Sequence, residues 1–563
     1  MISAEKMKEK NCVVGVDFGS DSVRALVVDA ASGEILANAV AGYPRWEKGL
    51  YCDAEKRQFR QHPLDYIDSF TACVTEVCQK SGLRDRIKAI SVDTTGSTVC
   101  PTDGRGVPLS LLPEFEHEPG AMFYLWKDHT ATAEAAEISR AFSGAETNYT
   151  RFMGPYSSEW YWAKILHAVR NYDFIREKAE GWVEHCDYMA NLLCGRTEPE
   201  KQYRCACAAG HKAYWHSAWG GLPSDACLNS LDPYLVQIKN TWTEPPEGCT
   251  QILGSITREW AEKLGLPETV LIVGGSFDAH AGAVGAGVCP GTMVVNIGTS
   301  AVNMLVEKAE NLPEETFAHI AGCAENSIIP GYVGVETSQA CYGDSFAWLK
   351  RLLLWPVRSI LAQSDLISEH QKAALAEELE RKIFSSLQKE AKLLGNEGIP
   401  LSLDWLNGRR YPCNRDDAYS VMEGINISAG APEFYRSLVE AAAFGQRLLF
   451  EQLRLRNICI ERIVAVGGIA QKSAYAMQVL SDVLQFPVSI SPVEQACAFG
   501  AAIYAATAIG AHPDIVGAQK AMCRPCEKTY LPNKSRAAYY DRRFAAYLAL
   551  AAKTDPAMKP FAK

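Results

Sequence analysis

Two short segments of the chain combine a glycine turn with side-chain hydroxyl groups, and this combination can bind phosphate. The first is Val16-Asp17-Phe18-Gly19-Ser20, with Ser22 close behind, and the second is Val295-Asn296-Ile297-Gly298-Thr299-Ser300. Each lies between two apolar runs, which predicts a strand, a tight turn and a second strand. Glycine allows close approach of the backbone, so the turn N–H groups and hydroxyls can face an anion. Two such hairpins are suited to holding one polyphosphate from both sides.

Two aspartates, one at the end of an expected strand and one just after another, are at positions suited to cation binding and proton transfer. A carboxylate at Asp17 suits hydrated Mg²⁺, which prefers a few carboxylates together with water and phosphate oxygens. Most single D-x-G turns are ordinary turns, so this prediction depends on the second hairpin. Asp278 follows the apolar run Val270–Gly274 and a Gly-Gly-Ser turn. It is placed either to accept the proton of a substrate hydroxyl or to cap a helix that begins at Ala279, and the local sequence favours neither.

Two widespread phosphate-binding signatures are missing from the chain. No G-x-x-x-x-G-K-[ST] run occurs, which excludes a P-loop enzyme, and no G-x-G-x-x-G follows an expected strand. The second absence argues against a dinucleotide-binding fold and against a protein-kinase loop. A third glycine turn, Gly467-Gly468, follows the apolar run Ile463–Val466. The three glycine turns together favour a divided nucleotide site.

Strands and helices in alternation are expected to position these turns. Three strands are predicted at Val13–Phe18, Val23–Asp29 and Ile35–Ala41, and Pro63 predicts the start of an amphipathic helix that ends near Gln79. In the second half, helices are predicted at about 472–485 and from the alanine-rich stretch to about Ile509. Such alternation predicts the α/β class.

A junction between two domains is expected near the glycine- and alanine-rich stretch at 282–291, after which the strand–turn–strand pattern begins again. We therefore expect an N-terminal domain at residues 12–287 and a C-terminal domain at residues 288–546. The charged stretch at about 352–392 carries no chemical motif and predicts an inserted helical pair.

The composition limits the class of protein. With 563 residues the chain is too long for one core, and 48% hydrophobic and 22% charged residues are typical of a globular protein. A net charge of −10 argues against a general nucleic-acid binder. No apolar run is long enough to span a membrane, and residues 1–10 lack the apolar stretch of a signal peptide. We expect a cytoplasmic protein without nucleic-acid or membrane partners.

Nineteen cysteines are scattered along the chain, and we expect reduced, mostly buried thiols. The closest pairs are Cys523-x-x-Cys526 and Cys205-x-Cys207. A structural zinc site needs four ligands, and neither pair has a convincing second pair. Structural cysteines are therefore favoured over metal binding.

These motifs resemble those of the FGGY carbohydrate kinases, a family in the superfamily of actin, hexokinase and the heat-shock chaperone ATPases. Val16 to Arg24 is similar to the family's first phosphate motif, Gly298-Thr299-Ser300 to its second, and Gly467 to Ser473 to its adenosine motif. The signature around Ser158 to Lys164 is imperfect, with Leu166 where a Trp is common. The resemblance covers about residues 12–545. It implies two α/β domains of the actin and hexokinase type (ribonuclease H-like), with the active site in the cleft between them.

Within the family, the resemblance is greatest to members that act on L-ribulose. The similar stretches are Gln61 to Tyr66, Leu125 to His129, Ser157 to Trp160, Ala209 to His216, Phe277 to Ala281 and Pro330 to Glu336. The resemblance implies ATP-dependent phosphorylation of L-ribulose to L-ribulose 5-phosphate, a step of L-arabinose catabolism, with ATP and Mg²⁺ bound.

The resemblance also assigns roles to single residues. Asp278 is implied as the catalytic base, and Asp17 and Asp278 as the ligands of Mg²⁺. Lys212, Glu336 and Gly96 are placed with Asp278 against the ketopentose, where Trp126 is either an apolar wall for the sugar or a core residue. Without the resemblance, Lys212 would be a solvated surface lysine and Glu336 a charge on a strand face. The residues assigned to the nucleotide are Asp17, Gly19, Ser20, Ser22, Gly298, Thr299, Ser300, Gly467, Gly468, Ala470 and Lys472.

Some alternatives stay open at this point. Gly96 stands where related kinases carry a larger residue, and a smaller side chain is expected to loosen discrimination among related sugars. A kinase for another ketopentose or a pentitol, such as D-ribulose or D-xylulose, is the first alternative. A nucleotide-driven binding or chaperone-like module is an alternative of another class, although no separate peptide-binding domain is seen. A homodimer is neither predicted nor excluded.

Overall fold

The computed structural model describes residues 11–312, 322–415 and 417–561. The chain divides into two compact units that are discontinuous in sequence. Unit 1 comprises Met1–Val294, Met304–Glu336 and Val493–Pro525, and unit 2 comprises Val295–Asn303, Thr337–Pro492 and Cys526–Lys563. The single boundary expected between residues 287 and 288 does not anticipate that residues 493–525 belong to unit 1. The family domain boundaries stay a prediction.

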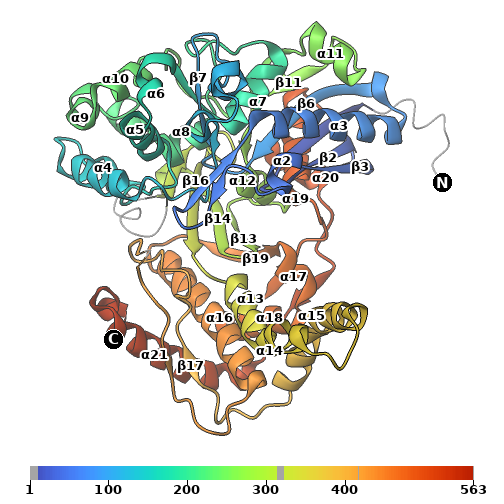
Figure 1. Ribbon diagram of the computed structural model, residues 1–563, viewed down its shortest axis with the longest axis vertical. Helices are drawn as coiled ribbons and strands as arrows, with labels where there is room; N and C mark the ends of the chain where they lie inside the picture. Colours follow the sequence, from blue (N-terminus) through green and yellow to red (C-terminus); the bar gives the residue numbers. More distant parts are fainter. Residues whose placement is uncertain (1–10, 313–321, 416, 562–563) are drawn as a thin grey trace. The chain divides into compact units, whose positions relative to one another are not determined.

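A sheet with the strand order β10-β11-β6-β1-β2-β3 forms the centre of unit 1 (Figure 1), and the short strand β12 also pairs with β6. The three strands expected near the N-terminus are present as β1, β2 and β3. β1 is antiparallel to β2 and parallel to β6. The bounds are β1 (Cys12–Phe18), β2 (Ser22–Asp29), β3 (Ile35–Gly42), β6 (Ile87–Thr94), β10 (Ile252–Ser255), β11 (Leu271–Val273) and β12 (Ser276–Phe277).

Glycines bring two helices close to each other and to this sheet. The expected alanine-rich helix is α19 (Ala496–Ala508), which packs against β1, β6 and α12 (Asp278–Gly285). A Cβ atom at Gly15 would lie 1.9 Å from the carbonyl oxygen of Ala498, and one at Gly500 would lie 1.8 Å from that of Ala281. Only glycine permits these approaches. They fix the start of α12 relative to the end of β1.

The amphipathic helix expected after Pro63 is α3 (Pro63–Ser81), with Pro63 in the first turn. His62 caps it by accepting the N–H of Leu64 at 3.2 Å, and the helix ends at Gly82, which has a φ of 64°. α3 packs against β2 and β3. This packing buries the apolar face that the sequence pattern predicts.

The remaining elements of unit 1 include a small sheet with the strand order β4-β5-β8-β7-β9 and several further helices, of which α4, α5, α6, α9 and α10 lie beside one another (Figure 1). Their bounds are β4 (Cys52–Asp53), β5 (Gln58–Gln61), β7 (Val99–Thr102), β8 (Phe123–Tyr124), β9 (Gly181–Glu184), α4 (Thr132–Gly144), α5 (Tyr161–Asn171), α6 (Asp173–Lys178), α7 (His185–Cys194), α8 (Ala206–Ala213), α9 (Asp225–Leu231), α10 (Pro233–Lys239), α11 (Arg258–Leu264), α20 (Ile515–Met522) and β15 (Gly322–Glu325). The chain crosses between the units within β13 (Gly291–Ile297), β14 (Ala301–Glu307) and β16 (Val333–Gln339).

In unit 2, β19 is parallel to β20, and β20 is antiparallel to β21. The helix predicted at about 472–485 is present as α18, and Ser473 caps its start by accepting the N–H of Ala476 at 3.2 Å. The bounds are β19 (Ile460–Val466), α17 (Gly468–Lys472), α18 (Ala474–Leu484), β20 (Val488–Ile490), β21 (Lys528–Tyr530), α16 (Ala431–Leu455) and α21 (Ala537–Thr554).

The charged stretch at 352–392 contains one short and one long helix, α14 (Trp355–Ser359) and α15 (Glu369–Ala391). They follow α13 (Gly343–Leu353). Ser368 and Gln371 form a capping box at the start of α15. Among the helices of the described residues, none has the length and apolar character needed to cross a membrane.

Candidate functional site

Two carboxyl groups of unit 1 meet where two parallel strands end. Asp17 of β1 and Asp93 of β6 are paired in register. Cys497, in the first turn of α19, joins them, and the possible ligand atoms of the three side chains lie within 4.8 Å of one another. Asp93 is fully buried, and apart from the Asp17 carboxyl its oxygens have no hydrogen-bond partner among the described residues. Buried carboxylate oxygens without donors fit a hard divalent cation such as Mg²⁺.

Burial controls the protonation of this pair. Burial, together with the charges of Asp17 and Asp278, raises the pKa of Asp93 well above its usual range. Burial also raises the pKa of Asp17, although the Arg24 guanidinium opposes this effect by donating to Asp17 Oδ2 at 3.0 Å. The two carboxyls therefore keep a proton more readily than isolated aspartates do.

We expect Asp93→Asn to stabilise the ligand-free protein, and to do so more at pH 8 than at pH 6. A carboxyl whose pKa is raised by folding contributes stability while it is protonated, and this contribution is lost as the pH rises through the folded-state pKa. Asparagine stays neutral, so the thermal midpoint of the variant should exceed that of the wild type by about 1–3 °C at pH 8. Calorimetry measures the difference, with the exposed Asp21→Asn as the control. A variant midpoint at or below the wild-type value at pH 8 would contradict the prediction.

Asp278 is the first residue of α12, one position earlier than the helix start expected at Ala279. Its Oδ1 accepts the N–H of Ala279 at 2.6 Å, so it contacts the helix start while its side chain stays partly exposed. Burial, with the charge of Asp17 as the next cause, raises the pKa of Asp278 to about 7. A partly exposed carboxyl with this pKa can accept a proton at neutral pH.

Lys212 and Glu336 lie close enough to Asp278 for their charges to affect its pKa. Lys212 Nζ is 4.0 Å from Glu336 Oε1, and Glu336 Oε2 is 3.0 Å from His280 Nε2. Burial acts to raise the pKa of Glu336, but Lys212 and the hydrogen bond from His280 outweigh it and hold the pKa well below its usual range. The alternative of a solvated surface lysine is wrong, because the Lys212 side chain is only 9% exposed.

Gly96 packs against Phe277 rather than leaving open space. A Cβ atom at residue 96 would lie 2.2 Å from Cδ1 of the Phe277 ring, so any larger residue would have to move that ring. The Phe277 ring thus occupies the space that a side chain at residue 96 would need, and looser discrimination among related sugars stays a prediction.

The turn after β1 carries the first predicted phosphate motif. The N–H of Gly19 donates to the carbonyl oxygen of Ser22 at 3.0 Å, and Trp126 Nε1 donates to Ser20 Oγ at 2.9 Å. Trp126 is half-buried, so it is neither a pure core residue nor a free surface ring. The structure thus brings Trp126 to Gly19 and Ser20, on the same strand end as Asp17.

In unit 2 the other two glycine turns come together. The N–H groups of Gly343 and Tyr342 donate to the carbonyl oxygens of Gly298 and Thr299 at 3.1 and 2.9 Å. Gly467 has a φ of 95°, and a Cβ atom there would lie 2.5 Å from the carbonyl oxygen of Ile297. The second phosphate motif and the adenosine motif are therefore neighbours within one unit.

The other predicted nucleotide residues of unit 2 differ in exposure. Gly468 and Lys472 are exposed, Ser300 is half-buried and Ala470 is buried. A Cβ atom at Gly468 would meet no atom within 4 Å. Gly468 and Lys472 therefore stand at an open surface of α17, whereas Ala470 packs below it.

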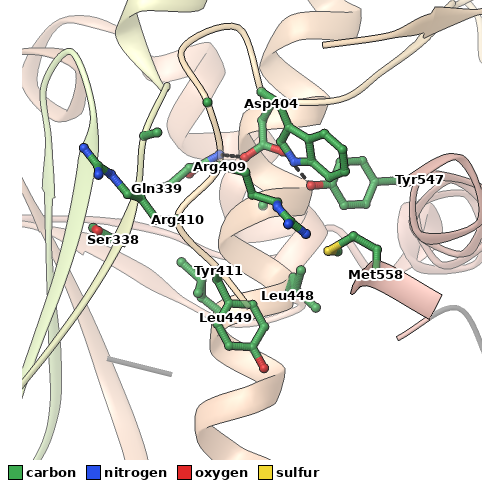
Figure 2. Close-up of a pocket in the computed structure, with 14 residues that line it drawn as sticks. Ser338, Gln339, Asp404, Arg409, Arg410, Tyr411, Leu448, Leu449, Tyr547 and Met558 are labelled. Carbon is green, nitrogen blue, oxygen red and sulfur yellow. Dashed lines mark hydrogen bonds between the residues drawn. The ribbon is translucent and has the colours of Figure 1, made fainter. Parts of the chain in front are cut away.

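A small cavity in unit 2 is lined by residues outside the predicted set (Figure 2). Asp404 accepts hydrogen bonds from Gln339 Nε2 at 2.6 Å and from the Tyr547 hydroxyl at 2.5 Å. Arg409 pairs with Asp555 at 2.9 Å. The cavity wall is thus held together by its own polar contacts.

Two clusters of possible ligand groups in unit 1 contain four residues that the sequence did not assign to the site: Asp93, His211, His280 and Cys497. Asp93 carries the same local signal as Asp17, a carboxyl at the end of an apolar strand. His280 and Cys497 lie in glycine- and alanine-rich helices, and only the packing of α12 and α19 brings them to the site.

The structure also groups three residues that the cysteine spacing alone does not connect. Possible ligand atoms of Cys186, Asp187 and Cys205 lie within 4.8 Å of one another in a fully buried position. Three ligands are fewer than the four of a structural zinc site. Structural cysteines stay the favoured interpretation.

Solved structures of other proteins share the fold of this chain. A xylulose kinase from Rhodospirillum rubrum matches with a TM-score of 0.75 over 97% of this chain and 100% of its own, at 21% identity. A Plasmodium falciparum glycerol kinase with ADP matches with a TM-score of 0.73 over 97% and 98%, at 15% identity. The fold is the two-domain α/β fold of the actin and hexokinase type, as the sequence predicts.

Sequence relatives specify the family. A ribulokinase from Vibrio parahaemolyticus is 41% identical over 95% of this chain and 94% of its own length, and one from Halalkalibacterium halodurans is 31% identical over 95% and 94%. Residues 293–509 match the C-terminal domain of the FGGY family of carbohydrate kinases. The chain belongs to the FGGY family of carbohydrate kinases, and it is an ATP-dependent sugar kinase.

Proposed function

We propose that this kinase transfers the terminal phosphoryl group of ATP to L-ribulose and forms L-ribulose 5-phosphate. The reaction would be a step of L-arabinose catabolism and would take place in the cytoplasm. Relatives named ribulokinase align with nearly the whole chain at up to 41% identity, which supports a ketopentose over other acceptors. The observation that carries the proposal is Asp278, a carboxyl with a pKa of about 7 beside Lys212 and Glu336.

In this proposal Asp278 accepts the proton of the acceptor hydroxyl. The hydroxyl oxygen bonds to the γ-phosphorus as the bond from that phosphorus to the bridging oxygen breaks, and ADP leaves. Lys212 donates to oxygens of the sugar, and Glu336 accepts from its hydroxyls. The turns at Gly19-Ser20 and Gly298-Thr299 hold the phosphates, and Gly467 to Lys472 hold the adenosine.

Asp17 and Asp278, with Asp93 beside Asp17, would hold Mg²⁺. Bound Mg²⁺ supplies positive charge that neutralises phosphate oxygens during transfer. The buried oxygens of Asp93 without donors support a cation at this position. Arg24 keeps Asp17 oriented by its hydrogen bond to Oδ2.

A coupled assay of ADP release across ketopentoses and pentitols tests the proposal. We expect L-ribulose to give the highest kcat/KM, with D-ribulose, D-xylulose and the pentitols below it. A higher kcat/KM for another sugar would replace L-ribulose with that sugar. ADP release at the same rate without any sugar would instead indicate a nucleotide-driven binding module.

We expect kcat/KM for the ketopentose to fall as the pH is lowered below about 7. A general base must be ionised, and burial with the charge of Asp17 raises the pKa of Asp278 to about 7. The active fraction should halve near that pH and then fall about tenfold for each further pH unit. A higher Mg²⁺ concentration should shift this fall in kcat/KM to lower pH, because a cation favours the ionised carboxyl. A profile that stays flat to about pH 5 would argue against Asp278 as the base.

A further inference from the structure

A line of three side chains leads from the core of unit 1 to Glu336. The thiol of Cys207 contacts His280 Nδ1 at 2.7 Å, and His280 Nε2 contacts Glu336 Oε2 at 3.0 Å. Cys207 is 1% exposed and His280 is fully buried, whereas the Glu336 side chain is 24% exposed. The line therefore runs from α8 through α12 and ends at the open side of the site.

Both hydrogen bonds along this line are donated in the same direction, from Cys207 to His280 and from His280 to Glu336. A carboxylate only accepts hydrogen bonds, so His280 Nε2 must carry the proton that is donated to Glu336. A neutral imidazole then has a lone pair on Nδ1. Burial raises the pKa of Cys207 well above its usual range, so its thiol keeps a proton that it can donate to that lone pair. Cys207 thus favours the one tautomer of His280 that can bind Glu336.

Among the described residues, the carboxylate that bonds to His280 is that of Glu336. The His211 ring packs against it with a centroid distance of 4.8 Å, and His211 Nε2 is bonded to Ser327 Oγ at 3.2 Å. Opposite Glu336 in the β15–β16 pair stands Gly322, where a Cβ atom would lie 2.6 Å from Met153 Cε and 3.0 Å from His211 Nδ1. The missing side chain at residue 322 leaves room for His211 beside the histidine–glutamate pair.

The second oxygen of Glu336 faces the sugar side. Its Oε1 is 4.0 Å from Lys212 Nζ, which is longer than a direct hydrogen bond. A sugar hydroxyl placed between the two groups can donate to Oε1 and accept from Lys212. This arrangement requires Glu336 to be held by Oε2, so that Oε1 keeps its orientation.

We propose that His280 is a positioning residue that holds Glu336 by Oε2 and presents Oε1 to a ketopentose hydroxyl, with Cys207 fixing the tautomer of His280. This inference rests on the proposed function. It means that two buried residues, His280 and Cys207, affect the binding of the sugar without contacting it.

A double-mutant cycle between His280 and Glu336 tests the inference. His280→Leu removes the donor, whereas His280→Gln replaces it with an amide N–H. We expect His280→Leu to raise the KM for the ketopentose about 10- to 100-fold, as the loss of a buried hydrogen bond to a charged group does. The KM for ATP should change less than about twofold, and His280→Gln should recover most of the sugar affinity. In a protein that already carries Glu336→Gln, adding His280→Leu should raise the KM for the ketopentose less than about twofold. The reason is that His280 acts through the Glu336 carboxylate.

Two results would overturn the inference: equal KM values for the Leu and Gln variants, or independent effects that multiply in the double variant.

If His280→Leu does not fold, Cys207 provides the second test. Cys207→Ala should raise the sugar KM about threefold, and Cys207→Ser, which keeps a donor, should lie closer to the wild type. Identical KM values for these two variants would remove the role of Cys207.

The wild-type enzyme separates this inference from the proposed function. A wild type that phosphorylates no ketopentose removes the proposed function. An active wild type whose sugar KM is insensitive to His280→Leu removes only the role of His280.

Discussion

Asp278→Asn is expected to lower kcat about 10²- to 10⁴-fold, the usual contribution of a general base. Asparagine keeps the size and one acceptor oxygen of the side chain, so the bond from the Ala279 N–H to residue 278 can persist. Sugar binding should persist as well, because Lys212 and Glu336 are unchanged. Initial rates of ADP release measure kcat, and titration calorimetry with the ketopentose measures binding.

Asp225→Asn is the matched control for this substitution. Asp225 is also the first residue of a short helix, α9, and it lies outside all the predicted motifs. It should show the helix-dipole cost of losing an N-terminal charge, about 0.3–1 kcal/mol, plus the loss of its ion pair with Lys239 at 2.6 Å, without a loss of kcat. If Asp278→Asn and Asp225→Asn had similar kcat values, Asp278 would be a helix-capping residue and not the base.

The sequence is most informative where one short segment contains both the element and its chemistry. The hairpin around Gly19 and the strand β1, which ends at Phe18, are predicted correctly because apolar alternation and a glycine turn are local signals. α3 is predicted for the same reason, by Pro63 at its start and an apolar face along its length. Local patterns therefore identify which residues stand at strand ends.

Contacts between distant segments are not available from such patterns. Cys497 reaches Asp17 because Gly15 lets α19 approach β1, and no sequence near Cys497 indicates this packing. The same holds for His280, whose partners Cys207 and Glu336 come from α8 and β16. The helix α17 was not predicted, because it has only five residues after the Gly467-Gly468 turn and is too short to show an apolar period. These residues complete the site, and their discovery requires the fold.

Gly467→Ala is expected to raise the KM for ATP at least about tenfold and to leave the KM for the sugar nearly unchanged. With φ at 95° and ψ at 171°, Gly467 occupies a backbone region that is essentially restricted to glycine, and another residue there costs about 1–3 kcal/mol. The new Cβ atom would also lie 2.5 Å from the carbonyl oxygen of Ile297 and 2.9 Å from Asn296 Oδ1. The second phosphate turn must therefore move. Steady-state kinetics with each substrate varied in turn measures both effects.

Gly398→Ala separates backbone strain from displacement of the phosphate turn. Gly398 lies in the same unit and also has a positive φ, of 75°, but a Cβ atom there meets nothing within 4 Å. Both alanine variants should lose stability, whereas only Gly467→Ala should lose ATP affinity. Unchanged ATP kinetics in Gly467→Ala would mean that the contact between Gly467 and Ile297 does not position the nucleotide. A parallel rise in the sugar KM would mean that the substitution disturbs the protein beyond the nucleotide turns.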